Sequence, residues 1–378
     1  MQKLHESDRW IVIPQTFSLG DTPLLLENGQ SLFQIHVRYE TYGTLNAQKS
    51  NAIYLCHAFS GDAHAAGYHT EGDQYAGWWD NMVGAGKTFD TNKYFMICSN
   101  VLGGCMGTTG PGSVNPETNE PYAMEFPSIT LGDMVNLQKL LIEHLGISRL
   151  IAVAGGSMGG MLALEWSVRF PEMVQSCIVL ASTPRLTAQG IAFNAVGRNA
   201  IVSDPGWMNG RYYGHTKPSG GLAIARMVGH ITYLSDESMR SKFGRRMKDT
   251  SMNTNLQQDL FEVEGYLLHQ GSKFVERFDA NTYIYLTRAM DWFDLGNDHG
   301  GLKEAFRRAK KVRYLIISFT SDWLFPTYQS KEMVFAMLRE GCEASFTEIK
   351  SPYGHDAFLL EVSQQDKIIR SFLGGLNV

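Results

Sequence analysis

A serine flanked by glycines, between an apolar run and a helical pattern, constrains this sequence more than any other feature. Residues 150–153 are apolar, and residues 162–167 have the pattern of a helix. Gly155, Ser157 and Gly159 fill the G-x-S-x-G pattern of a strand-to-helix turn, which holds the serine hydroxyl clear of the backbone. Glycine at both flanking positions lets neighbouring elements pass without a Cβ clash. The stretch predicts a nucleophilic serine; the alternative is a glycine-rich turn without chemistry.

The composition indicates a globular protein without a membrane or nucleic-acid surface. Of the 378 residues, 44% are hydrophobic and 19% are charged, and the formal net charge is −5. This is enough apolar material for a large core, and the charge gives no reason to expect nucleic acid or membrane as a partner. Residues 1–8 lack the apolar stretch of a signal peptide, and no run is long enough to span a bilayer. We expect a cytoplasmic protein.

The five cysteines show no C-x-x-C spacing. Cys56, Cys98 and Cys177 lie within short apolar runs, where they are expected to be buried thiols. This usage is typical of a reducing compartment.

Short apolar runs alternate with helical patterns along most of the chain. Within residues 16–45 the odd positions 33–39 are apolar and the even positions 34–40 are polar, which predicts antiparallel strands at one edge of a sheet and places Glu40 on a polar face. The remaining runs predict strands buried on both faces, with helices between them, and therefore a parallel sheet with helices on both sides. The predicted strands are 52–56, 94–98, 150–153, 174–180, 312–317 and 344–349, and the predicted helices are 130–145, 162–167, 329–339 and 365–373.

The alternation stops at Thr183 and Pro184 and returns near residue 311. The segment between is polar, mostly helical in pattern, and without short buried strands. We therefore predict a core made of residues 1–183 and 311–378, with a helical cap inserted at residues 184–310.

A serine nucleophile needs a base, and the base needs an orienting carboxylate. In sheets that carry such a turn the chain order is serine, then acid, then histidine, each in a loop after a strand. Asp322 follows the predicted strand 312–317, and His355 follows the strand 344–349. Ser157, Asp322 and His355 are therefore the predicted catalytic residues. Asp291 and Asp294 are rival acids, but they lie in the predicted cap.

An oxyanion formed at Ser157 needs backbone N–H donors. Met158 follows the serine at the start of the helix, and the loop after residues 52–56 offers a second donor, which we assign to Phe59. His57, Asp62 and His64 share that loop, but their spacing matches no metal-ligand pattern, so no metal is expected.

Seven separate stretches of the chain carry a family resemblance: residues 56–58, 61–64, 77–80, 99–105, 155–160, 231–235 and 354–359. Together they resemble the homoserine O-acyltransferases of the α/β-hydrolase type. The resemblance extends from the first strands to the last helix. It implies the α/β-hydrolase fold, a mostly parallel sheet with helices on both faces and an inserted helical cap.

The resemblance implies a ping-pong transfer of an acyl group from acyl-CoA to the hydroxyl of L-homoserine, an early step of methionine synthesis. Acyl-CoA would be a co-substrate, and no cofactor would be bound permanently.

Arg226 matches the family's substrate arginine, and a guanidinium suits a carboxylate because it donates two parallel hydrogen bonds. Asp356 matches the family's acid near the substrate ammonium group. The alternative to a substrate-binding role is structural: Arg226 could be a solvated surface residue, and Asp356 could cap a helix beginning at Ala357. The resemblance also implies a homodimer through the cap helices.

The identity of the acyl group depends mainly on Leu324. Succinyl-using members of the family carry an arginine after the Asp-Trp of the acid loop, whereas Leu324 follows Asp322 and Trp323 here. An uncharged residue favours acetyl-CoA, because a buried succinyl carboxylate needs a cation or several donors. The alternatives are a homoserine O-succinyltransferase, an esterase with the same triad, an enzyme that uses another acceptor such as serine, and a binding protein without catalysis.

Overall fold

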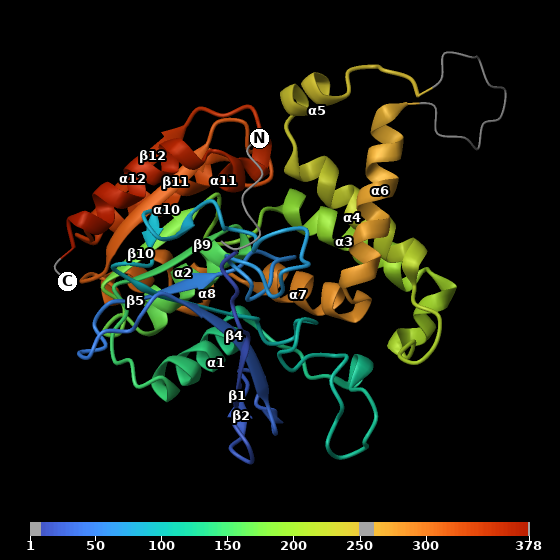
Figure 1. Ribbon diagram of the computed structural model, residues 1–378, viewed down its shortest axis with the longest axis horizontal. Helices are drawn as coiled ribbons and strands as arrows, with labels where there is room; N and C mark the ends of the chain where they lie inside the picture. The colour runs from blue at the N-terminus through green and yellow to red at the C-terminus, as the bar shows by residue number, and fades with distance from the viewer. Residues whose placement is uncertain (1–8, 249–260, 377–378) are drawn as a thin grey trace.

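The computed structural model describes residues 9–248 and 261–376, which form a central eight-stranded sheet surrounded by helices (Figure 1). The strands lie in the order β1-β4-β8-β5-β9-β10-β11-β12. These strands are β1 (Gln15–Ser18), β4 (His36–Tyr42), β5 (Ala52–Cys56), β8 (Phe95–Ser99), β9 (Ala152–Gly156), β10 (Ser176–Leu180), β11 (Arg313–Phe319) and β12 (Ala344–Ile349). Two small sheets pair β2 (Leu24–Leu25) with β3 (Ser31–Leu32) and β6 (Val83–Gly84) with β7 (Phe89–Asp90).

Helices connect the strands of the central sheet and fill the segment between β10 and β11. The α-helices are α1 (Leu131–His144), α2 (Met158–Arg169), α3 (Ala188–Val202), α4 (Ser219–Tyr233), α5 (Asp236–Lys242), α6 (Glu262–Arg277), α7 (Ala280–Trp292), α8 (Leu295–Asp298), α9 (Leu302–Arg308), α10 (Thr327–Arg339), α11 (Ala357–Leu360) and α12 (Val362–Gly374). Shorter 3-10 helices lie at Ala123–Glu125, Pro205–Gly210 and Gly354–Asp356. Within the described residues, no helix is both long and apolar enough to cross a membrane.

The predicted antiparallel edge is confirmed. β1 pairs antiparallel with β4, and β4 pairs antiparallel with β8. Ile35 and Tyr39 are buried as the alternation predicts, but the position predicted for Glu40 is wrong, because this residue is only 1% exposed. Its carboxylate oxygens lie 2.9 Å from His64 Nδ1 and 2.7 Å from His69 Nε2, and these imidazoles compensate the buried charge. Strand periodicity alone does not reveal such distant partners.

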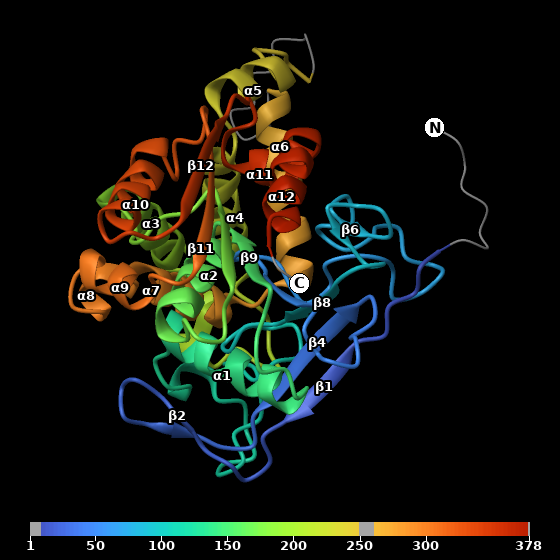
Figure 2. The same cartoon turned by 90° about the vertical axis from the view of Figure 1, so that its left-hand side faces the viewer.

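The sheet is covered on both faces, as the alternation of strands and helices predicts. Ile53 and Leu55 of β5 point to one apolar core, and Tyr54 and Cys56 point to the other. Helices α1, α2 and α10 contribute to the core that contains Tyr54, and α12 contributes to the opposite one. Figure 2 shows α10 and α12 on opposite sides of β11 and β12. The predicted α/β architecture is therefore confirmed.

The carboxyl ends of four neighbouring strands lie at the same edge of the sheet. β9, β10, β11 and β12 pair in parallel, with Gly156 beside Leu180 and Leu180 beside Ile317. The turn that carries Ser157 follows β9, and the loops that carry Asp322 and His355 follow β11 and β12. Because the strands are parallel and adjacent, these three segments meet at the same edge.

The segment from 184 to 310 is helical in the part that the structure describes, and it contains α3 to α9. Helix α4 packs between α3 and α6, and the three lie beside the sheet in Figure 1. Helix α9, near the end of the segment, packs instead against α10 and α2 of the core. The boundaries of the cap at residues 184 and 310 stay a prediction.

Candidate active site

Ser157 occupies the sharp turn between β9 and α2 in a backbone conformation that L-residues rarely adopt. Its φ is 59° and its ψ is −125°. A Cβ on Gly155 would clash with the carbonyl of Gly159, and one on Gly159 would clash with the carbonyl of Cys56, so glycine is required at both positions. The Ser157 N–H donates to Leu180 O at 3.0 Å, which fixes the turn against β10. Strain held in this way is a feature of functional sites.

The structure brings the three predicted catalytic side chains into one chain of hydrogen bonds. His355 Nε2 lies 2.8 Å from Ser157 Oγ, and His355 Nδ1 lies 2.8 Å from Asp322 Oδ2. The other carboxylate oxygen, Asp322 Oδ1, accepts from the N–H groups of Leu324 and Phe325 at 3.1 and 2.9 Å. Asp322 and His355 are each only 3% exposed. Both carboxylate oxygens are thus engaged, which fixes the imidazole between the acid and the hydroxyl.

The two rival acids have other partners. Asp291 forms an ion pair of 2.7 Å with Arg198 and accepts a hydrogen bond from Asn194 at 2.8 Å. Asp294 Oδ1 caps α8 by accepting from two backbone N–H groups. A buried ion pair in the helical segment is a structural contact, and it orients Asn194, which lines the pocket described next.

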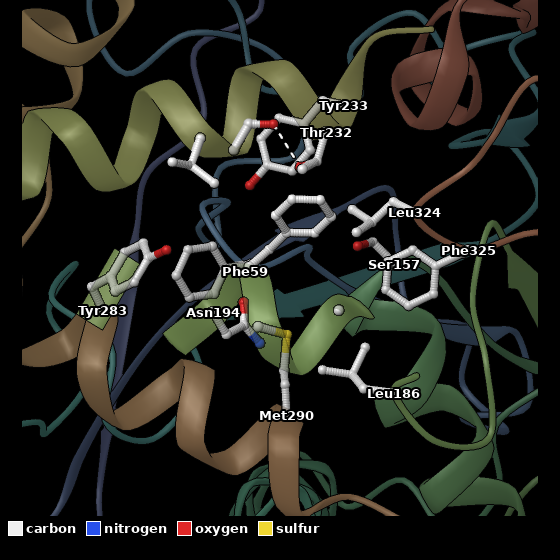
Figure 3. A pocket seen from close by; sticks show the side chains of 14 residues that line it. Phe59, Ser157, Leu186, Asn194, Thr232, Tyr233, Tyr283, Met290, Leu324 and Phe325 are labelled. Atoms are coloured by element: carbon white, nitrogen blue, oxygen red, sulfur yellow. Dashed lines mark hydrogen bonds between the residues drawn. The ribbon is translucent and has the colours of Figure 1, made fainter. Parts of the chain in front are cut away.

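An apolar pocket of about 540 Å³, including its opening to solvent, lies over Ser157 (Figure 3). Figure 3 shows Ser157 beside Leu324 and Phe325, with Tyr283 across the pocket. Among the described residues that line it, none carries a formal charge. The lining residues are Phe59, Ser157, Leu186, Gly190, Phe193, Asn194, Val228, Gly229, Thr232, Tyr233, Tyr283, Met290, Leu324 and Phe325. A small apolar group attached to Ser157 would therefore lie among uncharged, mostly apolar side chains.

The two predicted oxyanion donors lie on the two segments that border Ser157. Met158 is the first residue of α2, where a backbone N–H has no partner within the helix. Phe59 lies in a tight turn that is closed by a 2.8 Å hydrogen bond from Gly61 N to Ala58 O. The Phe59 ring lines the pocket and packs edge-on against Tyr283, with the ring centres 5.2 Å apart. Their role as donors stays a prediction.

Arg226 and Asp356 lie close to the chain of hydrogen bonds but do not line the pocket. The Arg226 guanidinium lies 5.6 Å from the centre of the Tyr233 ring, and that ring lies 6.1 Å from the His355 ring. Burial raises the pKa of Asp356, while the neighbouring His355 and Arg226 act in the opposite direction. Asp356 does precede α11, which begins at Ala357, but its side chain makes no capping hydrogen bond. The structure therefore gives no support to the alternative role of Asp356 as a helix cap.

Sequence reasoning assigned no role to several residues of this region. Tyr233 lies between Arg226 and His355, and Asn194 and Tyr283 line the pocket. Tyr233 falls within the stretch 231–235 that carries the resemblance, which was the only signal for it. Asn194 and Tyr283 carry no local signal, because their place depends on how the helices pack.

Among the described residues, Glu40, His64 and His69 are the group whose atoms lie close enough to hold a metal ion. Two ligands of one zinc ion, each about 2.0–2.1 Å from it, are about 3.3 Å apart in tetrahedral geometry. The nitrogen-to-oxygen distances here, 2.9 and 2.7 Å, are shorter and fit hydrogen bonds. His57 turns away, since its Nδ1 lies 2.8 Å from Ala58 O and its Nε2 accepts from Val101 N–H. The absence of a metal stays a prediction.

The Glu40–His64 pair is expected to make stability depend on pH. Burial alone would raise the pKa of Glu40, but the bonds to His64 and His69 hold it below its usual range. Burial would lower the pKa of His64, but Glu40 outweighs it and raises this pKa. The lowered pKa of Glu40 stabilises the folded state above the unfolded pKa of Glu, about 4.3. The raised pKa of His64 stabilises it below the unfolded pKa of His, about 6.5. The pair therefore contributes most to stability between these two pH values.

His64→Gln is therefore expected to lower the Tm most between about pH 4.3 and 6.5, and progressively less as the pH rises through the raised His64 pKa. Thermal unfolding of the parent and the variant, followed by circular dichroism from pH 5 to pH 9, measures this difference. The exposed His215, changed to Gln, is the matched control. A Tm difference that is the same at both ends of the pH range would contradict the assignment.

Comparison with known proteins agrees with this geometry. The family model of the alpha/beta hydrolase fold matches residues 51–362. The homoserine O-acetyltransferase of Methanosphaerula palustris is 56% identical over 358 residues, which cover 95% of this chain and 72% of that protein. The crystal structure of homoserine O-acetyltransferase from Bacillus anthracis matches with a TM-score of 0.91 at 33% identity, over 96% of this chain and 98% of that one. Esterase E22 matches with a TM-score of 0.89 at 30% identity, over 96% and 100%.

A parallel sheet with Ser157 on a strand-to-helix turn, followed in the chain by Asp322 and His355, defines the class of serine-dependent α/β-hydrolase-fold proteins. The similar proteins named above identify one family within this class. The chain belongs to the homoserine O-acetyltransferase family, as the resemblance predicts.

Proposed function

We propose that this protein transfers an acetyl group from acetyl-CoA to the hydroxyl of L-homoserine, for methionine biosynthesis, through an acetyl-Ser157 intermediate. The observation that carries the proposal is the hydrogen-bonded chain of Ser157, His355 and Asp322 beneath an apolar pocket. Membership of the family supports the choice of the two substrates. Acetyl-CoA acts as a co-substrate, and the proposal includes no resident cofactor or metal.

In the first half-reaction His355 Nε2 takes the proton of Ser157 Oγ, and Oγ attacks the thioester carbonyl carbon. The N–H groups of Met158 and Phe59 stabilise the oxyanion that forms. The carbon–sulfur bond breaks, and His355 gives the proton to the departing CoA sulfur. Asp322 keeps the imidazole oriented and stabilises its positive charge, because its Oδ2 lies 2.8 Å from Nδ1.

In the second half-reaction the acceptor hydroxyl takes the place of CoA. Arg226 binds the carboxylate of homoserine and Asp356 binds its ammonium group, so both charges are recognised beside His355. His355 takes the hydroxyl proton, the hydroxyl oxygen attacks the acetyl carbon, and the bond to Ser157 Oγ breaks. The proton then returns to Ser157, which completes the cycle.

The pocket supports acetyl over succinyl as the transferred group. Its described lining residues are uncharged, and Leu324 lies beside Ser157 (Figure 3). A succinyl carboxylate placed there would lose its hydration without gaining a cation. The methyl group of acetyl suits an apolar wall.

Leu324→Arg is expected to shift the ratio of kcat/KM for succinyl-CoA over acetyl-CoA by about 10-fold or more towards succinyl, because one charge-assisted hydrogen bond contributes about 1.5–3 kcal/mol. Steady-state kinetics with both donors measures the ratio. The isosteric Leu324→Met controls for a change in pocket shape alone and is expected to keep the parent preference. An unchanged ratio in the arginine variant would show that Leu324 does not face the acyl group.

The first test of the function is the mass of the intact protein after incubation with acetyl-CoA or succinyl-CoA and no acceptor. We expect acetyl-CoA to add the mass of one acetyl group, and L-homoserine to remove it faster than L-serine. Esterase E22 is similar in structure, so water is the competing acceptor to measure. Acetate release that is equally fast with and without homoserine would indicate an esterase. An unmodified mass under conditions of turnover would exclude the covalent intermediate.

We further propose that the protein is a cytoplasmic homodimer that associates through the cap helices. The five cysteines are free thiols, which suits a reducing compartment. Val196 on α3, Ile224 on α4 and Leu268 on α6 are 51%, 49% and 44% exposed, and an apolar surface on neighbouring helices favours self-association. Sedimentation velocity tests the dimer, and a single species with the mass of one chain would exclude it.

A further inference from the structure

The C-terminal end of α6 holds the turn that carries Phe59. Arg277, the last residue of α6, donates from Nη2 to the backbone carbonyl of Ser60 at 2.8 Å. The next residue, Phe278, packs its ring against the Phe59 ring, with the centres 5.6 Å apart. Two consecutive residues of the helix end thus contact two consecutive residues of the turn, one through a charge-assisted hydrogen bond and one through ring packing.

A second guanidinium reaches the same residue from α4. Arg226 Nη1 donates to Ser60 Oγ at 3.2 Å. Both guanidiniums lie against the ring of Phe274, with Arg226 4.6 Å and Arg277 5.9 Å from its centre. The two contacts differ in kind: that of Arg226 is to a side chain, whereas that of Arg277 is to the main chain.

We propose that Arg277 is a positioning residue for the acylation of Ser157: it fixes the Ala58–Gly61 turn so that the Phe59 N–H is presented to the oxyanion. The inference rests on the proposed function, because it takes Phe59 as an oxyanion donor. The Ser60 carbonyl and the Gly61 N–H belong to one peptide unit, which Arg277 holds from one side. The Gly61 N–H donates to Ala58 O, and this carbonyl shares its peptide unit with the Phe59 N–H. The bond from Arg277 therefore acts on the orientation of the Phe59 N–H through the hydrogen bond that closes the turn. A misplaced donor stabilises the transition state less, since stabilisation depends on donors fixed in advance.

On this proposal the two arginines have different roles: Arg226 acts in the second half-reaction, and Arg277 acts in both. Arg226 is the proposed partner of the homoserine carboxylate, so its bond to Ser60 Oγ is exchangeable when the acceptor enters. Arg277 contacts the main chain of the turn and is not a proposed substrate ligand, so we expect its bond to hold the turn for both tetrahedral intermediates. On this proposal a residue at the end of α6, in the helical segment, influences the acylation of Ser157 at the edge of the sheet.

The test measures acetylation of Ser157 by p-nitrophenyl acetate, which needs neither CoA nor homoserine, in Arg277→Met, Arg277→Lys and Lys273→Met. Lys273 is exposed one turn earlier on α6 and is the matched control. Arg277→Met is expected to lower the acylation rate constant by about 10-fold or more, a fraction of the 10²–10³-fold that loss of a whole donor costs. Arg277→Lys, which keeps the charge and a donor, should fall between Arg277→Met and the parent. Lys273→Met should match the parent.

The rate constant and the burst amplitude separate positioning from folding. A purely structural role would lower the amplitude, which counts intact sites, and leave the rate constant unchanged. That outcome, or a parent-like rate constant with only the KM for acetyl-CoA raised, overturns the inference. If Arg277→Met does not fold, Arg277→Lys decides by the same criteria. A parent protein that fails to acetylate homoserine, but whose acylation by p-nitrophenyl acetate depends on Arg277, would refute the proposed function and support this inference.

Discussion

Replacing Ser157 by alanine is expected to lower kcat for acetyl transfer by about 10⁶-fold and to abolish the acetylated species. The variant loses the atom that attacks the thioester, and the remaining catalysis is what substrate binding and the oxyanion donors provide. The fold should be retained, because alanine keeps the Cβ and meets the same backbone strain at a φ of 59°. KM should change little. Steady-state turnover and the mass of the intact protein after incubation with acetyl-CoA measure the two effects.

Controls must show that the loss of activity is not caused by unfolding and that no other residue is the nucleophile. Ser241→Ala, on the exposed part of α5, is expected to keep the parent activity and the acetylated species. Thermal unfolding should show that the Ser157→Ala protein is folded. An acetyl group found on the Ser157→Ala protein after mild incubation would place the nucleophile elsewhere and contradict the assignment.

The turn at Ser157 could be predicted because its requirements are local. A Cβ at Gly155 or Gly159 would clash with the carbonyl of Cys56, so both positions require glycine, and a five-residue pattern is enough to show this requirement. Asp322 and His355 could be predicted because parallel strands end at the same edge of the sheet. Residues in the loops after these strands are therefore expected to lie close together, even when no distance is known. The sequence therefore predicted the order and the meeting of the three residues, and the structure adds the 2.8 Å distances.

The remaining features depend on contacts between segments that are far apart in the chain. Glu40 was placed on a polar face because strand alternation contains no information about His64 and His69. Arg277 has no local signal, since its bond to Ser60 joins the end of α6 to a loop 217 residues earlier. Arg226 and Asp356 could be named only through the family resemblance. Contacts of this kind follow from how the helices dock, which periodicity and spacing do not encode.

Asp322→Asn is expected to lower kcat by about 10⁴-fold while the protein stays folded. In the parent, Asp322 Oδ1 accepts from the N–H groups of Leu324 and Phe325, so the amide oxygen of asparagine should take this place. The amide NH₂ would then face His355 Nδ1 and donate to it. The imidazole would carry its proton on Nε2, where it donates to Ser157 instead of accepting the serine proton. Single-turnover acylation by acetyl-CoA measures the loss directly.

Asp294→Asn is the matched control for this change. Asp294 Oδ1 also accepts from two backbone N–H groups, at 3.0 Å each, but it does so at the start of α8. Asparagine caps helices about as well as aspartate, so this variant should keep the parent stability and activity. The comparison separates the loss of a carboxylate from the loss of the carboxylate that orients His355. An Asp322→Asn protein that acylates within about tenfold of the parent would mean that another group sets the tautomer of His355, because a wrong tautomer costs far more than that.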